Sequence, residues 1–270
     1  MEFESYSFER KDDAGRAVTV SGRTIGERQR PAVALIASLG RGSSDFDRLA
    51  ADLAAAGYFA ILPDPRGIGA SDGPMESVTF DDLAADVVEV LETLTSGPVV
   101  LIGHAFGNRL ARMVATRRPD LVERIILLAC GGQVAPAPEV GKALFATFDE
   151  QLSPAAHLEN VRIAFFAAGN DPEPWRDGWY PGVARMQVGA LESLPSATWR
   201  AGGGRPILIV QALEDAVAPI ANAHALRDEL GNQVRIVELG SAGHAMLPEQ
   251  PERVSEIVLA ELAAPIAECA

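Results

Sequence analysis

Residues 97–108 read GPVVLIGHAFGN, and this short stretch is the strongest indication of the fold. An apolar run of strand length leads into the pentapeptide GHAFG, and a helix-forming segment follows it. Glycines at Gly103 and Gly107 permit a tight turn and close packing of the strand against the helix. Such a turn holds its central residue, Ala105, at the carboxyl end of a strand, where open α/β sheets bind their ligands. The stretch therefore predicts a parallel sheet with a site at Ala105.

The composition indicates a folded protein with an acidic surface. Hydrophobic residues make up 48% of the 270 residues and the mean hydropathy is +0.10, so material for a core is ample. A chain of this length forms one large α/β domain with an insertion, or two small domains. The formal net charge of −14 argues against nucleic acid and anionic membranes as partners, because both repel such a surface.

Cysteine usage and the N-terminal segment predict a cytoplasmic location. Cys130 ends an apolar run and Cys269 lies one residue from the C-terminus, so we expect no disulfide between them. The first residues lack the basic and apolar regions of a signal peptide. No apolar run approaches the roughly 18 residues that a membrane span requires.

Apolar runs of strand length alternate with amphipathic segments of helical period, which is typical of a parallel sheet covered by helices. An antiparallel pair is expected at 2–10 and 18–23. The buried strands are expected at 32–39, 59–63, 99–103, 125–129, 207–211 and 234–239. The helices are expected at 46–56, 80–94, 108–116, 220–230 and 252–264. The predicted fold class is therefore α/β, doubly wound, with a mostly parallel sheet.

Two ionisable side chains follow later strands at the same edge of this sheet. Asp215 comes after the strand near 206–211, and His244 comes after the strand at 234–239. A buried carboxylate would orient the imidazole and stabilise its charged form, while the imidazole would accept a proton from a nucleophile. Asp215 alone is equally typical of a helix N-cap, and Glu214 is an alternative partner for the base. The joint order of the residues favours the catalytic interpretation.

The chain resembles the α/β-hydrolases over nearly its whole length. The sequence GHAFG matches the G-x-S-x-G nucleophile elbow of that family, with Ala105 where the attacking serine stands. The family order of nucleophile, acid and base then falls on Ala105, Asp215 and His244. The stretch DPRGIGASD is similar to the family's D-x-R-G-x-G-x-S loop. The resemblance implies that Asp64 and Arg66 lock this loop.

The oxyanion hole of such enzymes uses backbone N–H groups, and here the sequence departs from the family. Members usually carry His-Gly after the first parallel strand, whereas this chain reads SLGR from position 38. A backbone donor needs no particular side chain, so the hole survives this change. The resemblance implies the N–H of Gly40 as one donor, with Leu39 as the second choice, and the N–H of Phe106 as the other donor.

One connection is far longer than an ordinary crossover between strands, because the chain after Cys130 returns to the sheet only near position 204. The resemblance implies a helical lid at 132–203, inserted into a hydrolase core formed by 1–131 and 204–270. The insertion holds all three tryptophans of the chain.

Most aromatic side chains of the insertion are expected to build a small core of their own. Trp175, Trp179 and Tyr180 lie in a stretch broken by proline and glycine, and we expect these three to line the substrate pocket.

Alanine offers no nucleophile, so no acyl-enzyme forms through Ala105. The retained Asp215, His244 and both elbow glycines favour an inactive Ser→Ala variant of a serine hydrolase that still binds substrate. A natural, non-catalytic ligand-binding homologue is the alternative. Serine is the expected original nucleophile at position 105. An aspartate there would imply epoxide or haloalkane hydrolysis, and a cysteine would imply a lactonase.

The expected activity of the serine form is hydrolysis of a small apolar carboxylic ester, with lactone or C–C bond hydrolysis by the same triad as alternatives. Arg41 or Arg109 would bind a substrate carboxylate, as in a half-ester, if either faces the pocket. A solvent-facing position or a salt bridge is the alternative for each. No metal or organic cofactor is expected, because the histidines are isolated and no dinucleotide fingerprint follows a strand. The protein is expected to be a monomer or a homodimer.

Overall fold

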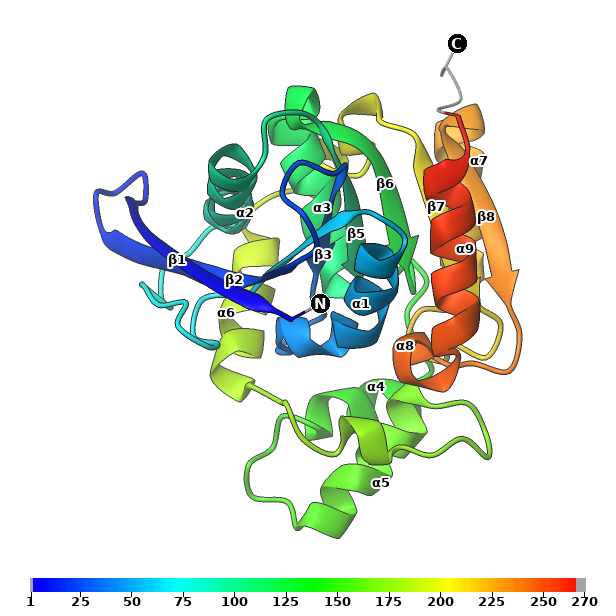
Figure 1. Cartoon of the computed structure of the whole chain (residues 1–270). Coiled ribbons are helices and arrows are strands. Elements are labelled where there is room, and N and C mark those ends of the chain that lie inside the picture. Colours follow the sequence, from blue (N-terminus) through cyan, green and yellow to red (C-terminus); the bar gives the residue numbers. More distant parts are fainter. Residues whose placement is uncertain (1, 266–270) are drawn as a thin grey trace.

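The computed structural model describes residues 2–265, and in them an eight-stranded sheet carries helices on both faces (Figure 1). Cys269 lies outside the described residues. The strands are β1 (Glu4–Lys11), β2 (Ala17–Ile25), β3 (Ala32–Ile36), β4 (Phe59–Pro63), β5 (Val99–His104), β6 (Val122–Leu128), β7 (Ile207–Ala212) and β8 (Val234–Leu239). The helices are α1 (Asp47–Ala55), α2 (Phe80–Leu94), α3 (Phe106–Arg117), α4 (Pro138–Ala146), α5 (Pro154–Phe165), α6 (Pro181–Glu192), α7 (Ala221–Leu230), α8 (Met246–Glu249) and α9 (Pro251–Ala263).

The strand order is β1-β2-β4-β3-β5-β6-β7-β8, which confirms the predicted fold class. β1 pairs with β2 and β2 with β4 in antiparallel fashion, and every pairing from β4 to β8 is parallel. Because parallel strands share a direction, the carboxyl ends of β3, β5, β6, β7 and β8 lie along one edge. The loops that follow these ends are the ones expected to carry the site.

Two hydrophobic layers hold the helices to the sheet. On one face, α1 and α9 pack on the strands through Leu49, Leu53, Val254 and Val258. On the other face, α2 and α3 do so through Phe80, Leu91, Leu110 and Val114. Each such buried side chain contributes about 1.5–3 kcal/mol, and the two layers fix the strand ends relative to one another. Among residues 2–265, no helix is long and apolar enough to cross a membrane.

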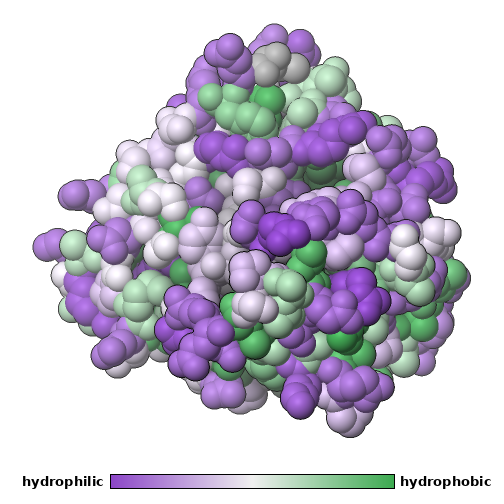
Figure 2. All heavy atoms as spheres, turned by 90° about the horizontal axis from the view of Figure 1, so that it is seen from below, coloured by the Kyte–Doolittle hydropathy of each residue, from purple (hydrophilic) through white to green (hydrophobic). Residues whose placement is uncertain are grey.

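The insertion between β6 and β7 divides into two parts. Helix α6 belongs to the main core, because Val183, Met186 and Ala190 pack in the layer formed by α2 and α3. Helices α4 and α5 project below the sheet and share a small separate cluster with Trp175 (Figure 1). Figure 2 shows this lower side of the molecule, where apolar patches alternate with hydrophilic side chains. The boundary of a lid at 132–203 stays a prediction.

Strand β3 ends earlier than the sequence predicts, at Ile36 instead of position 39. A Cβ atom on Gly107 would lie 2.1 Å from the carbonyl oxygen of Ile36 and 2.6 Å from that of Ala37. The start of α3 therefore approaches the backbone at the point where β3 ends. The chain beyond Ala37 leaves the sheet and is free to form a loop beside the elbow.

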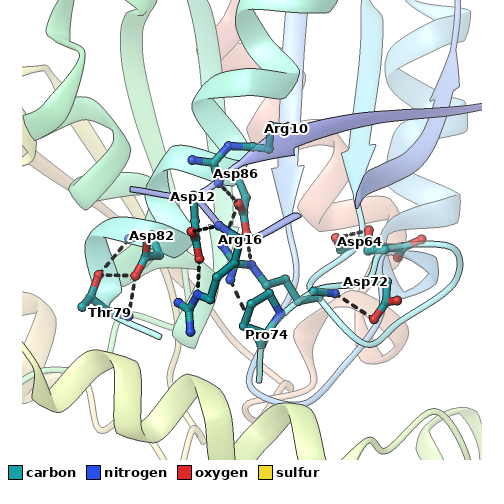
Figure 3. A network of polar contacts seen from close by, with 12 residues as sticks. Arg10, Asp12, Arg16, Asp64, Asp72, Pro74, Thr79, Asp82 and Asp86 are labelled. Atoms are coloured by element: carbon teal, nitrogen blue, oxygen red, sulfur yellow. Dashed lines mark hydrogen bonds and ion pairs between the residues drawn. The ribbon is translucent and has the colours of Figure 1, made fainter. Parts of the chain in front are cut away.

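The loop after β4 is held by a different ion pair from the predicted one. Arg66 does not pair with Asp64; its guanidinium donates to Asp86 of α2 at 2.6 and 3.0 Å. Arg10 of β1 also pairs with Asp86, and Asp64 instead accepts a hydrogen bond from the N–H of Ser43 at 3.0 Å. Asp64 and Asp86 lie well apart in Figure 3. The lock thus joins β1, the loop and α2.

Candidate active site

The elbow between β5 and α3 has the strained geometry that its glycines predict. Ala105 adopts φ 50° and ψ −105°, a conformation that costs a non-glycine residue about 1–3 kcal/mol. A Cβ atom on Gly103 would lie 2.3 Å from the carbonyl oxygen of Gly107, so neither glycine tolerates a side chain. The N–H of Ala105 donates to the carbonyl of Leu128 on β6 at 3.0 Å. The elbow is therefore locked from both neighbouring strands.

Asp215 and His244 come together as a buried pair, although they lie on different loops. The Nδ1 atom of His244 is 3.0 Å from each carboxylate oxygen of Asp215. The backbone N–H groups of Val217 and Ala218 donate to the same carboxylate at 3.0 and 2.7 Å, which fixes its orientation. With Nδ1–H directed at the carboxylate, Nε2 is the ring nitrogen left to accept a proton. Glu214 is exposed and is not the partner of the imidazole.

A second histidine supports the loop that carries His244. The Nε2 atom of His104 is 2.8 Å from the carbonyl oxygen of His244, and the two rings are 5.0 Å apart. Burial lowers the pKa of His104 to about 3, so its ring is neutral and donates Nε2–H to that carbonyl. His104 lies at the end of β5, and it therefore ties the base loop to the strand that precedes Ala105.

Gln211 at the end of β7 links three chain segments behind the pair. Its Oε1 accepts the N–H of Cys130 at 3.0 Å, and its Nε2 donates to the carbonyl of Ala218 at 2.7 Å. The ends of β6 and β7 and the Asp215 loop are thus joined by one buried side chain. Sequence reasoning did not single out Gln211. The signal in the sequence that could have identified Gln211 is an amide side chain in an otherwise apolar strand.

Ala105 and His244 line one cavity of about 410 Å³ between the sheet edge and the insertion. Trp175 and Trp179 line it as predicted, and the Nε1–H of Trp179 donates to the carbonyl of Trp175 at 2.7 Å. Phe145 also lines the cavity and is 66% exposed, so the mouth opens on the side of α4. The size and the aromatic walls suit a small apolar ligand.

Tyr180 does not line this cavity, contrary to the sequence-based expectation. It precedes α6, its side chain is 38% exposed, and its backbone N–H donates to the carbonyl of Gly40 at 2.9 Å. Tyr180 therefore contacts the site loop through its backbone, because the start of α6 directs its ring outward. The roles of Trp175 and Trp179 toward a ligand stay predictions.

The preferred oxyanion donor is occupied. The N–H of Gly40 donates to Oε1 of Gln187 at 2.8 Å, and Gly40 does not line the cavity. Leu39 and Phe106 do line it, and within residues 2–265 neither of their N–H groups has a hydrogen-bond partner. In this conformation Leu39, the second choice, is therefore the available donor beside Phe106. Whether either amide acts on an oxyanion stays a prediction.

Gln187 itself was not identified from the sequence. It is 2% exposed and lies on the apolar stripe that Val183, Met186 and Ala190 form along α6. A polar residue on such a stripe signals a specific buried partner. The identity of that partner depends on packing between segments far apart in the chain, so the sequence alone does not provide it.

The two candidate arginines have different environments. The guanidinium of Arg41 donates to both carboxylate oxygens of Asp45 at 2.6 Å and lies over the rings of Trp175 and Trp179 at 4.6 and 4.5 Å. The alternative of a salt bridge therefore holds for Arg41, although it lines the cavity. Arg109 also lines the cavity, and in the described part of the chain its side chain makes no hydrogen bond or ion pair. Within residues 2–265, no three acidic, histidine or cysteine side chains are grouped so as to hold a metal ion.

Comparison with known proteins places this geometry in context. The profile of the Alpha/beta hydrolase family matches residues 33–257. A putative non-heme bromoperoxidase, BpoC of Mycobacterium tuberculosis, is 28% identical over 76% of this chain and 83% of its own length. A 2-hydroxymuconate semialdehyde hydrolase of a Pseudomonas species is 25% identical over 73% of this chain and 74% of its own. A thermophilic esterase structure from Thermogutta terrifontis aligns over 96% of this chain and 98% of its own, with TM-score 0.78 and 22% identity.

Proposed function

The chain belongs to the alpha/beta hydrolase family, and on that premise we propose that its site binds a small carboxylic ester without turning it over. The serine form of the same site would be a carboxylic-ester hydrolase. The observation that carries the proposal is the buried Asp215–His244 pair on the cavity that Ala105 lines. Such a pair supplies the proton transfer in enzymes of acyl transfer, and Ala105 stands where their nucleophile would be.

In the serine form, the hydroxyl at position 105 would attack the ester carbonyl while Nε2 of His244 takes its proton. The N–H of Phe106 and one amide of the SLGR loop would stabilise the oxyanion. His244 would then protonate the leaving alcohol and activate the water that releases the acid. Asp215 holds the imidazole in the required tautomer throughout. With alanine, the same pocket binds the ester and the first bond never forms.

A natural ligand-binding homologue is the second candidate, and Gln187 is the observation that favours it. A hydrolase that has lost only its nucleophile would keep its oxyanion donors free. A buried side chain that accepts the hydrogen bond of such a donor serves no purpose there. Here the N–H of Gly40 is fully committed to Gln187. Lactone and C–C bond hydrolysis use the same residues and remain alternatives for the serine form.

The test is the variant Ala105→Ser, assayed with p-nitrophenyl acetate, butyrate and octanoate. We expect burst-phase release of p-nitrophenol followed by turnover, because the other parts of the triad are in place. The matched control Ala105→Ser with His244→Gln should lose that turnover by several orders of magnitude. If the folded Ala105→Ser protein hydrolysed none of these esters above background, the ester-hydrolase proposal would be wrong and the ligand-binding candidate would replace it.

A further inference from the structure

A second, smaller cavity adjoins the one at Ala105. Its volume is about 170 Å³, and it lies between α3, α7 and the segment before β7. Arg109, Gly131 and Gly132 line both cavities, so only these residues and a few neighbours separate them. A ligand that reaches past Arg109 from the main cavity would enter this space.

The walls of the smaller cavity are positively charged. Arg109, Arg112 and Arg200 all line it, and no carboxylate does among the residues that the structure describes. Arg200 pairs with Glu229, and Arg112 donates to the carbonyl and side-chain oxygens of Asn108 at 3.2 and 3.0 Å. Arg109 has no such partner in the part of the chain that the structure describes. Three guanidinium groups thus line one space, and the one carboxylate that pairs with any of them, Glu229, does not line it.

This arrangement is costly without an anion. Arg112 is 2% exposed, and burial lowers the pKa of both Arg109 and Arg112, the latter to about 10. Both therefore remain charged at neutral pH, and they repel each other. The Trp199 ring lies 5.0 Å from the Arg112 guanidinium and is 5% exposed. Its buried Nε1–H has no hydrogen-bond partner within residues 2–265. Buried charges and donors of this kind are normally paired.

We propose that this arginine pocket (Arg109, Arg112, Arg200 and Trp199) binds the carboxylate of a substrate whose ester group lies at Ala105. The inference rests on the proposed function and narrows it to half-esters of short dicarboxylic acids. Arg109 lies on α3 four residues beyond Ala105, the N-cap of that helix, which is about 6 Å along its axis, and both residues line the main cavity. A four- or five-carbon diacid spans such a distance. Because the net charge of −14 repels anions elsewhere, the pocket would supply the selectivity.

The experiment compares monomethyl succinate with dimethyl succinate, titrated by calorimetry into the Ala105 protein at pH 7.5. We expect the half-ester to bind at least about tenfold more tightly, as a charged hydrogen bond predicts. Arg109→Gln should abolish that preference. The matched control is Arg117→Gln on the same helix, whose exposed side chain pairs with Asp81 and lines neither cavity; it should keep the full preference.

The folding of Arg109→Gln is itself informative. Because Arg109 has no hydrogen-bond or ion-pair partner among residues 2–265, its removal orphans no group there, and the midpoint of urea unfolding should not fall. Arg109→Lys, which keeps the charge and loses the planar fork, should retain part of the preference. Equal or tighter binding of the diester, a preference that survives Arg109→Gln, or no binding of either compound at millimolar concentration would overturn the inference. None of these outcomes involves turnover. The proposal that the Ala105→Ser protein hydrolyses esters is therefore tested separately.

Discussion

At the scale of single residues, the conformation of Ala105 is imposed by its neighbours. The positive φ of 50° persists with a side chain that performs no chemistry. Its cause is the close approach of Gly103 to Gly107, and of Gly107 to Ile36 on β3. The backbone of the elbow is therefore independent of the residue at its tip. Packing of the surrounding sheet offsets the free-energy cost of this strained backbone.

A glycine at the elbow should relieve this strain. Glycine adopts positive φ without a steric penalty, so Ala105→Gly should leave the free energy of unfolding unchanged or raise it by about 1 kcal/mol. Urea unfolding measures the change. The control is Ala111→Gly within α3, where a loss of about 1–2 kcal/mol is expected, because a helix interior disfavours glycine and a fully buried methyl group is removed. A larger loss at position 105 than at position 111 would show that the elbow is not strained.

Residue types and their order along the chain were enough to predict that Asp215 and His244 meet at one edge of the sheet, because each follows a strand that pattern alone locates. The same reasoning proposed both Arg41 and Arg109 and had no means to choose between them. The two arginines differ in whether a carboxylate pairs with the guanidinium. Asp45 neutralises Arg41 from four residues away, whereas Arg109 faces segments that join it only in the folded chain.

At the scale of elements, helix α6 acts on the site because its Gln187 accepts the N–H of Gly40. The alternation of strands and helices predicted the sheet, because each element there carries its own periodic signal. Helix α6 lies in a long insertion, and its position depends on packing against α2 and the SLGR loop. The hydrogen bond between Gln187 of this helix and Gly40 therefore could not be predicted from the sequence. The same holds for Arg66, whose partner is Asp86 and not the predicted Asp64.

Freeing Gly40 should raise the activity of the serine form if this amide is an oxyanion donor. We predict that adding Gln187→Met to Ala105→Ser raises kcat for p-nitrophenyl butyrate by about 10- to 100-fold, since one such donor is worth about 10²–10³. Methionine has a similar length and accepts hydrogen bonds only weakly.

The control for this experiment is Gln187→Glu in the same background. Glutamate still accepts the Gly40 N–H, so kcat should stay at or below that of Ala105→Ser alone. An unchanged kcat in the methionine variant would assign the oxyanion donor to Leu39.

The ion pair between α2 and the loop after β4 should be a major structural contact. Asp86 pairs with Arg66, whose side chain is 1% exposed, and with Arg10. Asp86→Ala leaves a buried guanidinium without its counter-charge, so the free energy of unfolding should fall by about 3–5 kcal/mol. Thermal and urea unfolding test this. Glu173→Ala, which breaks the exposed pair with Arg176, should cause no measurable loss; equal effects of the two variants would contradict the prediction.

At the scale of the whole molecule, the site is a meeting point of loops from distant parts of the chain. His104 ends β5 and Ala105 follows it, Asp215 lies on the loop after β7, and His244 lies on the loop after β8. The hydrogen bond from His104 to the carbonyl of His244 joins residues 140 positions apart. A neutral histidine at this junction makes the stability of the fold depend on pH.

The sign of that dependence follows from the direction of the shift. Burial lowers the pKa of His104 from 6.5 to about 3, so between these values the unfolded chain binds a proton that the folded protein does not. The contribution of His104 is therefore complete above pH 6.5 and is lost as the pH falls toward 3, by about 1.4 kcal/mol per pH unit. Burial raises the pKa of Asp86 and of Glu249, which opposes this loss, so the slope of the wild type alone is not diagnostic.

The comparison that isolates His104 is the variant His104→Gln, whose amide N–H can reach the same carbonyl and does not titrate. Urea unfolding at pH 7.5, 6.5, 5.5 and 4.5 gives the free energy of unfolding of each protein, with pH 7.5 as its own reference. We predict that the variant is less stable than the wild type at pH 7.5, because glutamine fills the ring's space poorly. We also predict that the two curves converge as the pH falls, since only the wild type must keep a buried imidazole neutral. Parallel curves would mean that His104 binds its proton equally in the folded and unfolded chains, and the prediction that burial keeps the folded imidazole neutral would then be wrong.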